Sequence, residues 1–285
     1  MWQYRLRMLF KSLLHIPSVK RVIWPNIQMM FAKAPLKFPI HFPFYCLQIL
    51  FWRLRDFTSE LHFDFRRGIT TSILIQVKEL MCNDRQIKKS VIGEYGNRYR
   101  PAYAWRVQYF LNKLAAIHNV QENQVALVDY GCGAGRILFL AHEAGFYPVA
   151  GVELSPTLVE LAQHNLKNYL HKFSRRPEYI KAQDVKEQTK PKIQTSQTSS
   201  HECILIHHAN AAEFEIPDTA GVLFFFDPFA EKIFDLVFQR VNESLNRNPR
   251  TLHVLDKWCK VDFQKYGFTL LEERYTIKLW QKIRT

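Results

Sequence analysis

The stretch from Ala126 to Leu154 constrains the fold more than any other part of the chain. It opens with a short apolar run, Ala126–Tyr130, as a buried parallel strand would, and the turn GCGAG then places three glycines in five positions. Arg136–Ala144 has helical character, and Gly145 stands where a helix C-terminal cap is expected. Val149–Glu153 returns as a second strand that ends in a carboxylate. The pattern therefore predicts a β-α-β unit.

The glycine turn also predicts a ligand site, because a backbone without Cβ atoms can bend sharply and approach a ligand closely. Its spacing is G-x-G-x-G, which differs from the G-x-G-x-x-G fingerprint of dinucleotide-binding folds. Glu153 follows about one β-α-β unit later, where its carboxylate can accept hydrogen bonds from both hydroxyls of a ribose. The alternative is a structural turn in some other α/β protein.

The rest of the chain continues the alternation of helices and strands. Two further helices are expected, from Pro156 toward Leu170, with Ser155 as N-cap, and over Ala230–Asn246. The expected strands are Cys203–His207, Val222–Phe226, Thr251–Leu255 and a closing hairpin of Phe268–Glu273 with Tyr275–Ile283. Alternating strands and helices followed by an antiparallel end predict an α/β fold with a single sheet.

The segment VDYGCGAGRILFLAHEAGFYPVAGVELSPTLVELA resembles class I, seven-stranded S-adenosylmethionine-dependent methyltransferases. It looks closest to the non-SET protein-lysine methyltransferases of the ATP-synthase c-subunit type, more distantly to the nucleosomal histone H3 lysine type, and to bacterial enzymes of similar layout. The resemblance covers about Tyr95 to the C-terminus. It implies a Rossmann-like seven-stranded methyltransferase sheet and S-adenosylmethionine as cofactor.

The same resemblance implies the cofactor-binding positions. It places the turn along the methionyl part of the cofactor and Glu153 on its ribose. The loop after the third strand usually carries an acid that meets the adenine amino group. Asn210 stands there in this chain, and its side-chain carbonyl can still accept from the adenine. The methionyl positions implied are Asp129, Gly131, Gly133 and Gly135.

The fourth expected strand runs into Asp227-Pro228-Phe229, where an open α/β sheet places its chemistry. Family members that methylate amino groups of bases or glutamine amides carry Asp/Asn-Pro-Pro-aromatic at this point, and this chain has one proline fewer. Asp227 could orient an N–H group while Phe229 packs near the methyl sulfonium, which makes both candidate catalytic residues. The alternative is a strand-end Asp that caps the following helix.

The segment before the first strand is rich in tyrosine. In class I methyltransferases this part of the chain often folds over the cofactor, which makes Tyr95, Tyr99 and Arg100 candidate lid residues. Packing of the tyrosines at the entry of the helix that follows is the equal alternative.

Charge divides the chain unevenly. The formal net charge is +13 (39 Lys and Arg against 26 Asp and Glu), and residues 1–55 hold nine of the basic residues and no acidic one. The spacing at the start of this extension predicts a basic amphipathic helix that ends before Pro17, and an apolar, aromatic stretch of about 15 residues follows, short of the ~20 that a spanning helix needs. Three interpretations remain: an anchor at an anionic membrane surface, a helical cap on the catalytic domain, or a targeting segment.

We therefore expect three parts: an α-helical, basic extension at 1–57, a helical lead-in at 58–118, and a methyltransferase domain at 119–285. A polar insertion at about 172–201 is expected to be a mobile surface loop. The five cysteines include no C-x-x-C pair, which predicts neither a metal site nor a disulfide framework. Cys132 in the glycine turn reads as a nucleophile or as a small residue tolerated there.

These features predict an S-adenosylmethionine-dependent methyltransferase (EC 2.1.1.-) that acts on an amine, a protein lysine above all. The expected location is the cytoplasm, at the inner face of a membrane if residues 1–55 bind lipid. A nucleic-acid base methyltransferase is one alternative, although the near-balanced charge of residues 56–285 argues against it. The others are a non-catalytic cofactor-binding or membrane-tethered protein and, more distantly, a nicotinamide-dependent oxidoreductase.

Overall fold

The computed structural model describes residues 47, 56, 58–72, 101–174 and 203–284. The chain divides into two compact units, Met1–Phe57 and Thr58–Thr285, and everything below concerns the second. The interpretations of the basic extension, and most of the polar insertion, therefore lie outside the described residues. Within the described residues, no helix combines the length and the hydropathy needed to cross a membrane.

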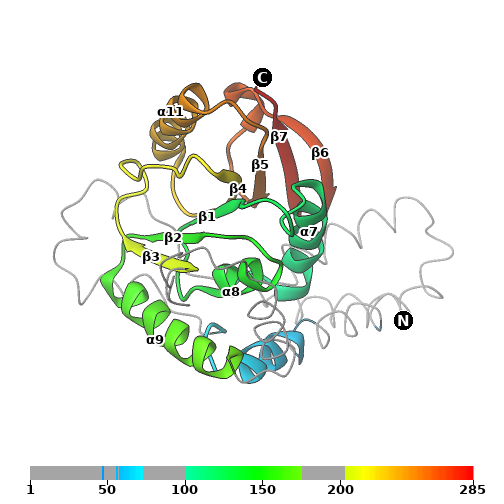
Figure 1. Cartoon of the computed structure of the whole chain (residues 1–285), viewed down its shortest axis with the longest axis vertical. Helices are drawn as coiled ribbons and strands as arrows, with labels where there is room; N and C mark the ends of the chain where they lie inside the picture. The colour runs from blue at the N-terminus through cyan, green and yellow to red at the C-terminus, as the bar shows by residue number, and fades with distance from the viewer. Residues whose placement is uncertain (1–46, 48–55, 57, 73–100, 175–202, 285) are drawn as a thin grey trace, which may run out of the picture. The chain divides into compact units, whose positions relative to one another are not determined.

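A seven-stranded mixed sheet organises this unit, in the order β3-β2-β1-β4-β5-β7-β6 (Figure 1). The pairs from β3 to β5 are parallel, whereas β7 runs antiparallel to both β5 and β6. The strands are β1 (Ala126–Tyr130), β2 (Val149–Glu153), β3 (Ile204–His208), β4 (Ala220–Phe226), β5 (Leu252–Lys257), β6 (Thr269–Arg274) and β7 (Ile277–Lys282). The predicted α/β class and the antiparallel end of the sheet are confirmed.

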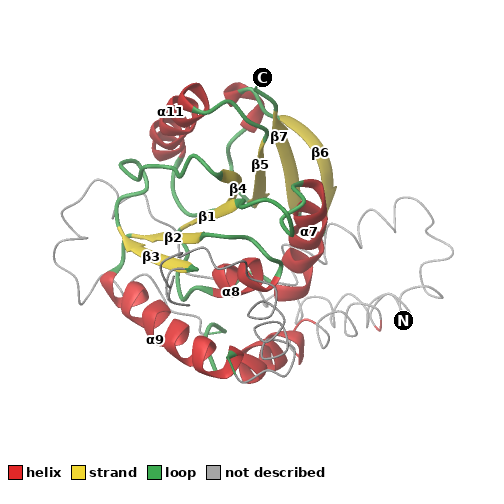
Figure 2. Ribbon diagram, in the orientation of Figure 1, coloured by secondary structure: helices red, strands yellow, loops and turns green. Residues whose placement is uncertain are grey.

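Within the described part of this unit, four α-helices accompany the sheet (Figure 2), together with the short 3-10 helix η3 (Phe263–Tyr266). Ser155 caps α9 as predicted, since its Oγ accepts the backbone N–H of Leu158. A further helical segment at residues 58–67 precedes them. The helices are α7 (Ala104–Ile117), α8 (Arg136–Glu143), α9 (Pro156–Phe173) and α11 (Glu231–Arg247).

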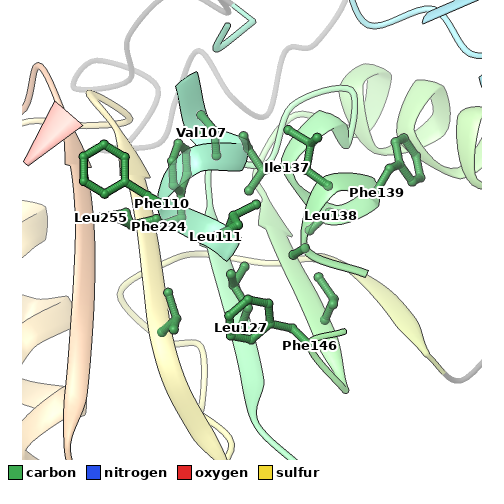
Figure 3. Close-up of a cluster of buried hydrophobic side chains, with 14 of the residues drawn as sticks. Val107, Phe110, Leu111, Leu127, Ile137, Leu138, Phe139, Phe146, Phe224 and Leu255 are labelled. Carbon is green, nitrogen blue, oxygen red and sulfur yellow. The ribbon is translucent and has the colours of Figure 1, made fainter. Parts of the chain in front are cut away.

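Each face of the central strands is covered by its own hydrophobic cluster. Leu127, Phe224 and Leu255 point toward α7 and α8, whose side chains meet them in Figure 3. The alternate residues, such as Val128 and Phe225, pack on the other face with α11 and η3. Successive strand side chains point to opposite faces, so strands covered on both sides are apolar over most of their length. The three-layer arrangement leaves the carboxyl ends of the parallel strands as the edge where loops meet.

The element boundaries differ from the prediction by a few residues. Helix α9 continues to Phe173, past the predicted stop near Leu170, because Tyr169 and Phe173 stack with each other and Tyr169 also stacks on Phe139 of α8. Tyr275 lies in the hairpin turn with Thr276, both at positive φ (57° and 63°), and is not part of the last strand. Tertiary packing and turn geometry set these limits, and neither is visible as sequence periodicity.

Candidate active site

The glycine turn lies between β1 and α8, and its conformation explains its composition. Gly131, Gly133 and Gly135 have φ of 78°, 53° and 88°, a region that residues with a Cβ rarely adopt. A Cβ on Gly131 would also come within 2.9 Å of the Pro228 side chain. The turn after β1 therefore lies directly against the turn after β4, and the structure brings two of the predicted site motifs together.

Glu153 ends β2 beside the same turn and holds it in place. One carboxylate oxygen accepts the backbone N–H of Gly133 and the other accepts that of Ser155, each at 2.9 Å. Burial raises the pKa of Glu153, and the hydrogen bonds from the backbone oppose this rise. Each carboxylate oxygen has further acceptor capacity, so the side chain can hold the turn and still accept from a ribose hydroxyl.

Asp129 lies one strand away, next to the last residue of β1. Its side chain is buried (2% exposed), and Oδ2 has no hydrogen-bond partner among the described residues. A buried carboxyl oxygen without a partner costs free energy unless a ligand supplies a donor. S-adenosylmethionine carries such a donor in its cationic amino group, so the residues beside the turn fit the predicted cofactor.

Asn210 lies in the loop after β3, which is tied to the end of β2 by a hydrogen bond from Ala209 N to Glu153 O. Its side-chain carbonyl accepts the backbone N–H of Ala212 at 2.9 Å, and its amide donates to the Glu213 carboxylate at 2.7 Å. Asn210 thus caps its own turn at the carboxyl edge of the sheet. One acceptor position on its carbonyl remains for an adenine, and that role stays a prediction.

The two candidate catalytic residues have different environments. Asp227 follows β4 immediately and takes φ of 42°, an uncommon conformation that is often found at functional sites. Phe229 is only 7% exposed, and its ring packs in the core at 4.7 Å from the ring of Phe234 on α11. Little of the Phe229 surface therefore remains to meet a ligand, and its predicted contact with a sulfonium stays untested.

A cluster of aromatic rings around the ammonium of Lys257 lies at the end of β5 and was not predicted from the sequence. The Nζ of Lys257, buried at 1% exposure, lies 5.2 Å from the ring centroids of Tyr103 and Phe226 and 4.9 Å from that of Trp258. Trp258 follows the strand at φ of 62° and is 48% exposed. Residues at positive φ thus follow both β4 and β5. The only sequence signal was an Asp-Lys-Trp run at a strand end.

The lead-in segment contributes a buried network that the sequence analysis also missed. Arg136, the first residue of α8, forms ion pairs with Glu60 and Asp64 and donates to Thr71 Oγ1 at 2.8 Å. Asn165 of α9 donates to Thr70 O and to Ala134 O in the glycine turn, each at 3.0 Å. Residues 70–72 are thereby fastened beside the turn. The predicted lid residues Tyr95, Tyr99 and Arg100 lie outside the described residues.

Cys132 packs against β2 within the glycine turn. A Cβ on Gly151 would come within 2.7 Å of its sulfur, so the absence of a side chain at Gly151 makes room for the thiol. Burial raises the pKa of the Cys132 thiol well above its usual range, which keeps it protonated and favours the packing interpretation over a nucleophile. Among the described residues, no group of three His, Cys, Asp or Glu is placed to hold a metal ion.

Comparison with known proteins gives local similarity and a shared fold. No protein-family model matches the chain. A stretch of 47 residues is 45% identical to the ribosomal protein L11 methyltransferase of Paraburkholderia phymatum, and a stretch of the same length is 43% identical to that of Burkholderia multivorans. Each match covers 16% of this chain and 15% of the relative, so the chain spans about one seventh of the length of the curated relatives it matches.

Two solved structures are similar over longer stretches. Magnesium protoporphyrin IX methyltransferase from Synechocystis PCC 6803, solved with bound S-adenosylmethionine, is 14% identical, with 66% of this chain and 87% of that chain covered and a TM-score of 0.37. An RNA methyltransferase from Salinibacter ruber, in complex with S-adenosyl-L-homocysteine, is 17% identical, with 61% and 88% covered and a TM-score of 0.36. The strand order and the antiparallel β7 are those of the class I methyltransferase sheet. The predicted seven-stranded, Rossmann-like methyltransferase sheet is therefore present in this chain.

Proposed function

We propose that this chain is an S-adenosylmethionine-dependent methyltransferase that methylates a nitrogen of a protein acceptor, most specifically a lysine side chain. One observation carries the cofactor assignment: the Glu153 carboxylate at the end of β2 holds the Gly133 amide of the turn after β1. The Glu153 carboxylate and the glycine turn thus meet at the edge of the sheet where open α/β folds bind ligands, which supports a ribose-binding role for Glu153. The local similarity to ribosomal protein L11 methyltransferases supports a protein acceptor.

We assign cofactor binding to residues at the ends of β1, β2 and β3 and acceptor binding to residues at the end of β4. Asp129 and the glycine turn would hold the amino-acid end of the cofactor, Glu153 its ribose, and Asn210 its adenine. The cofactor supplies an electrophilic methyl group. Asp227, which lies next to the glycine turn through Pro228, would hold the acceptor nitrogen in line for direct transfer. A lysine acceptor must lose its proton first, and an apolar surrounding lowers the pKa of an amine and favours that loss.

The proposal is tested first by calorimetric titration of the full chain with S-adenosyl-L-homocysteine and, in parallel, with NADH. Saturable binding of S-adenosyl-L-homocysteine alone is the expected result. Binding of NADH alone would replace the proposal with an oxidoreductase. Transfer of tritium from labelled S-adenosylmethionine to purified ribosomal protein L11, to extracted proteins and to extracted RNA then identifies the acceptor class. Label on RNA alone would overturn the protein acceptor and leave the methyltransferase standing.

A further inference from the structure

Asp129 is a carboxyl group that the surrounding fold does not stabilise as an anion. It lies in β1 between Gly151 of β2 and Phe224 of β4, which are its register partners in the two parallel pairs. Neither neighbour offers a polar side chain. Its Oδ2 is buried and has no partner among the described residues. Glu153, which is also buried, differs because both of its oxygens accept backbone N–H groups.

The charged and titratable groups around Asp129 make its ionisation harder. Burial raises the pKa of Asp129 well above its ordinary value, and the negative charge of Glu153 on the adjacent strand raises it further. The Cys132 thiol in the turn is kept neutral by burial, and His208 on β3 interacts with Glu153. The guanidinium of Arg136 on α8 is already shared between Glu60 and Asp64.

We propose that Asp129 is protonated while the cofactor site is empty and that binding of the cofactor expels this proton. The O–H bond of the carboxyl group breaks, the proton passes to the solvent, and the resulting carboxylate pairs with the cationic amino group of the ligand. The ion pair with the ligand amino group compensates the negative charge of the Asp129 carboxylate, which has no such partner in the empty site. This inference rests on the proposed function, because it needs a ligand with an amino-acid end at the glycine turn.

The arrangement makes Asp129 a specificity-determining residue for the amino-acid end of the ligand. A ligand that carries an adenosine and a sulfur but lacks the amino group should bind without releasing the proton. 5′-Methylthioadenosine is such a ligand, whereas S-adenosyl-L-homocysteine carries the amino group. The pair therefore separates the chemistry at Asp129 from the contacts that Glu153 and Asn210 make with the nucleoside.

The experiment is calorimetric titration of the full chain with each ligand in phosphate and in Tris, whose protonation enthalpies differ, between about pH 7 and pH 8, where both buffer. For S-adenosyl-L-homocysteine, the difference in heat should report the release of up to about one proton per site, and the affinity should rise with pH by at most about tenfold per unit. The methylthioadenosine titrations should show no such difference. Equal proton release by both ligands, or none by S-adenosyl-L-homocysteine, would overturn the inference.

Two variants assign the proton to its residue. Asp129→Asn should bind S-adenosyl-L-homocysteine more weakly and without proton release, and should bind methylthioadenosine as the unmodified protein does, which also shows that its site is folded. Glu153→Gln should still release protons with its residual binding, although fewer than the unmodified protein, because burial of Asp129 remains while the Glu153 charge is lost. Undiminished release in Asp129→Asn contradicts the inference even though the cofactor assignment stands. Absence of S-adenosyl-L-homocysteine binding to the unmodified chain would instead remove the proposed function.

Discussion

The two halves of the carboxyl edge are built by opposite means. At the ends of β1 and β2, two buried carboxyl groups, Asp129 and Glu153, surround a turn held through backbone N–H groups. At the ends of β4 and β5, the buried ammonium of Lys257 lies among aromatic rings. Each of these two strands is followed directly by a residue at positive φ. The two carboxyl groups of the first half would attract the positive charge of the proposed cofactor. The second half leaves an exposed indole, that of Trp258, where an acceptor would approach.

The contrast shows how each half depends on the rest of the chain. The half at β1 and β2, which we propose binds the cofactor (the cofactor half), is held by a hydrogen bond between Gly133 and Glu153, which are 20 positions apart in one β-α-β unit. The half at β4 and β5, which we propose faces the acceptor (the acceptor half), brings Tyr103, which precedes α7, next to Lys257 on β5. Substitutions in the cofactor half should therefore change the affinity for the cofactor. Substitutions in the acceptor half should change the rate of methyl transfer and leave that affinity unchanged. The predictions below test that division.

The largest effect is expected from Arg136→Met, which should lower the free energy of unfolding by about 3–5 kcal/mol. The substitution leaves Glu60 and Asp64 without the cation that both of them contact in a largely buried site. Urea denaturation measures the change. Arg240→Met is the matched control, because its ion pair with Glu243 is exposed and should contribute less than about 1 kcal/mol. Equal losses in the two variants would show that the lead-in network does not stabilise the cofactor half.

Glu153→Ala should weaken S-adenosyl-L-homocysteine binding by at least about 100-fold, or about 2.7 kcal/mol. It removes the expected ribose acceptor and leaves the Gly133 and Ser155 amides without their partner. Isothermal calorimetry measures the affinity. Glu153→Gln keeps one acceptor oxygen and should lose less. Affinity unchanged in both variants would break the assignment of the cofactor half.

Asp227→Ala should reduce methyl transfer by about 10–100-fold and leave the affinity for S-adenosyl-L-homocysteine within about twofold. The carboxylate is expected to orient the acceptor nitrogen and not to contact the cofactor. Tritium transfer to acceptor proteins and calorimetry on the same preparation measure the two effects. Asp218→Ala, in an exposed ion pair with Arg247, is the control and should change neither. A large loss of affinity in Asp227→Ala would place this residue in the cofactor half.

The smallest effect is expected from Trp258→Ala, which should lower transfer by about 2–10-fold and unfolding free energy by less than about 1 kcal/mol. The indole is half exposed and covers Lys257, so its loss should alter the acceptor side with little cost to the core. Leu236→Ala on α11 is a control of equal exposure (47% against 48%). Matching activities in the two variants would show that Trp258 is only a surface residue.

Much of the fold was predictable because its signals are local. Strands covered on both faces favour apolar runs: β4 is one throughout, and β1 and β2 are apolar up to a carboxylate near or at their ends. The turn after β1 needs positive φ at three positions, which few residues other than glycine adopt, so its sequence is recognisable. Ser155-Pro156 likewise marks the start of α9. The sequence analysis did not find the Arg136 network or the rings around Lys257, because their members are far apart along the chain and follow no periodicity.

The sequence by itself determined the succession of strands and helices along the chain, the glycine turn and the acid at the end of β2. These depend on backbone conformation and on burial, which individual residue types impose locally. Only the tertiary structure decided what each side chain contacts. Glu153 accepts a backbone N–H group of the turn, Phe229 packs in the core, and the buried Oδ2 of Asp129 has no partner among the described residues. The reason is physical, since hydrogen bonding and desolvation depend on neighbours that distant parts of the chain supply.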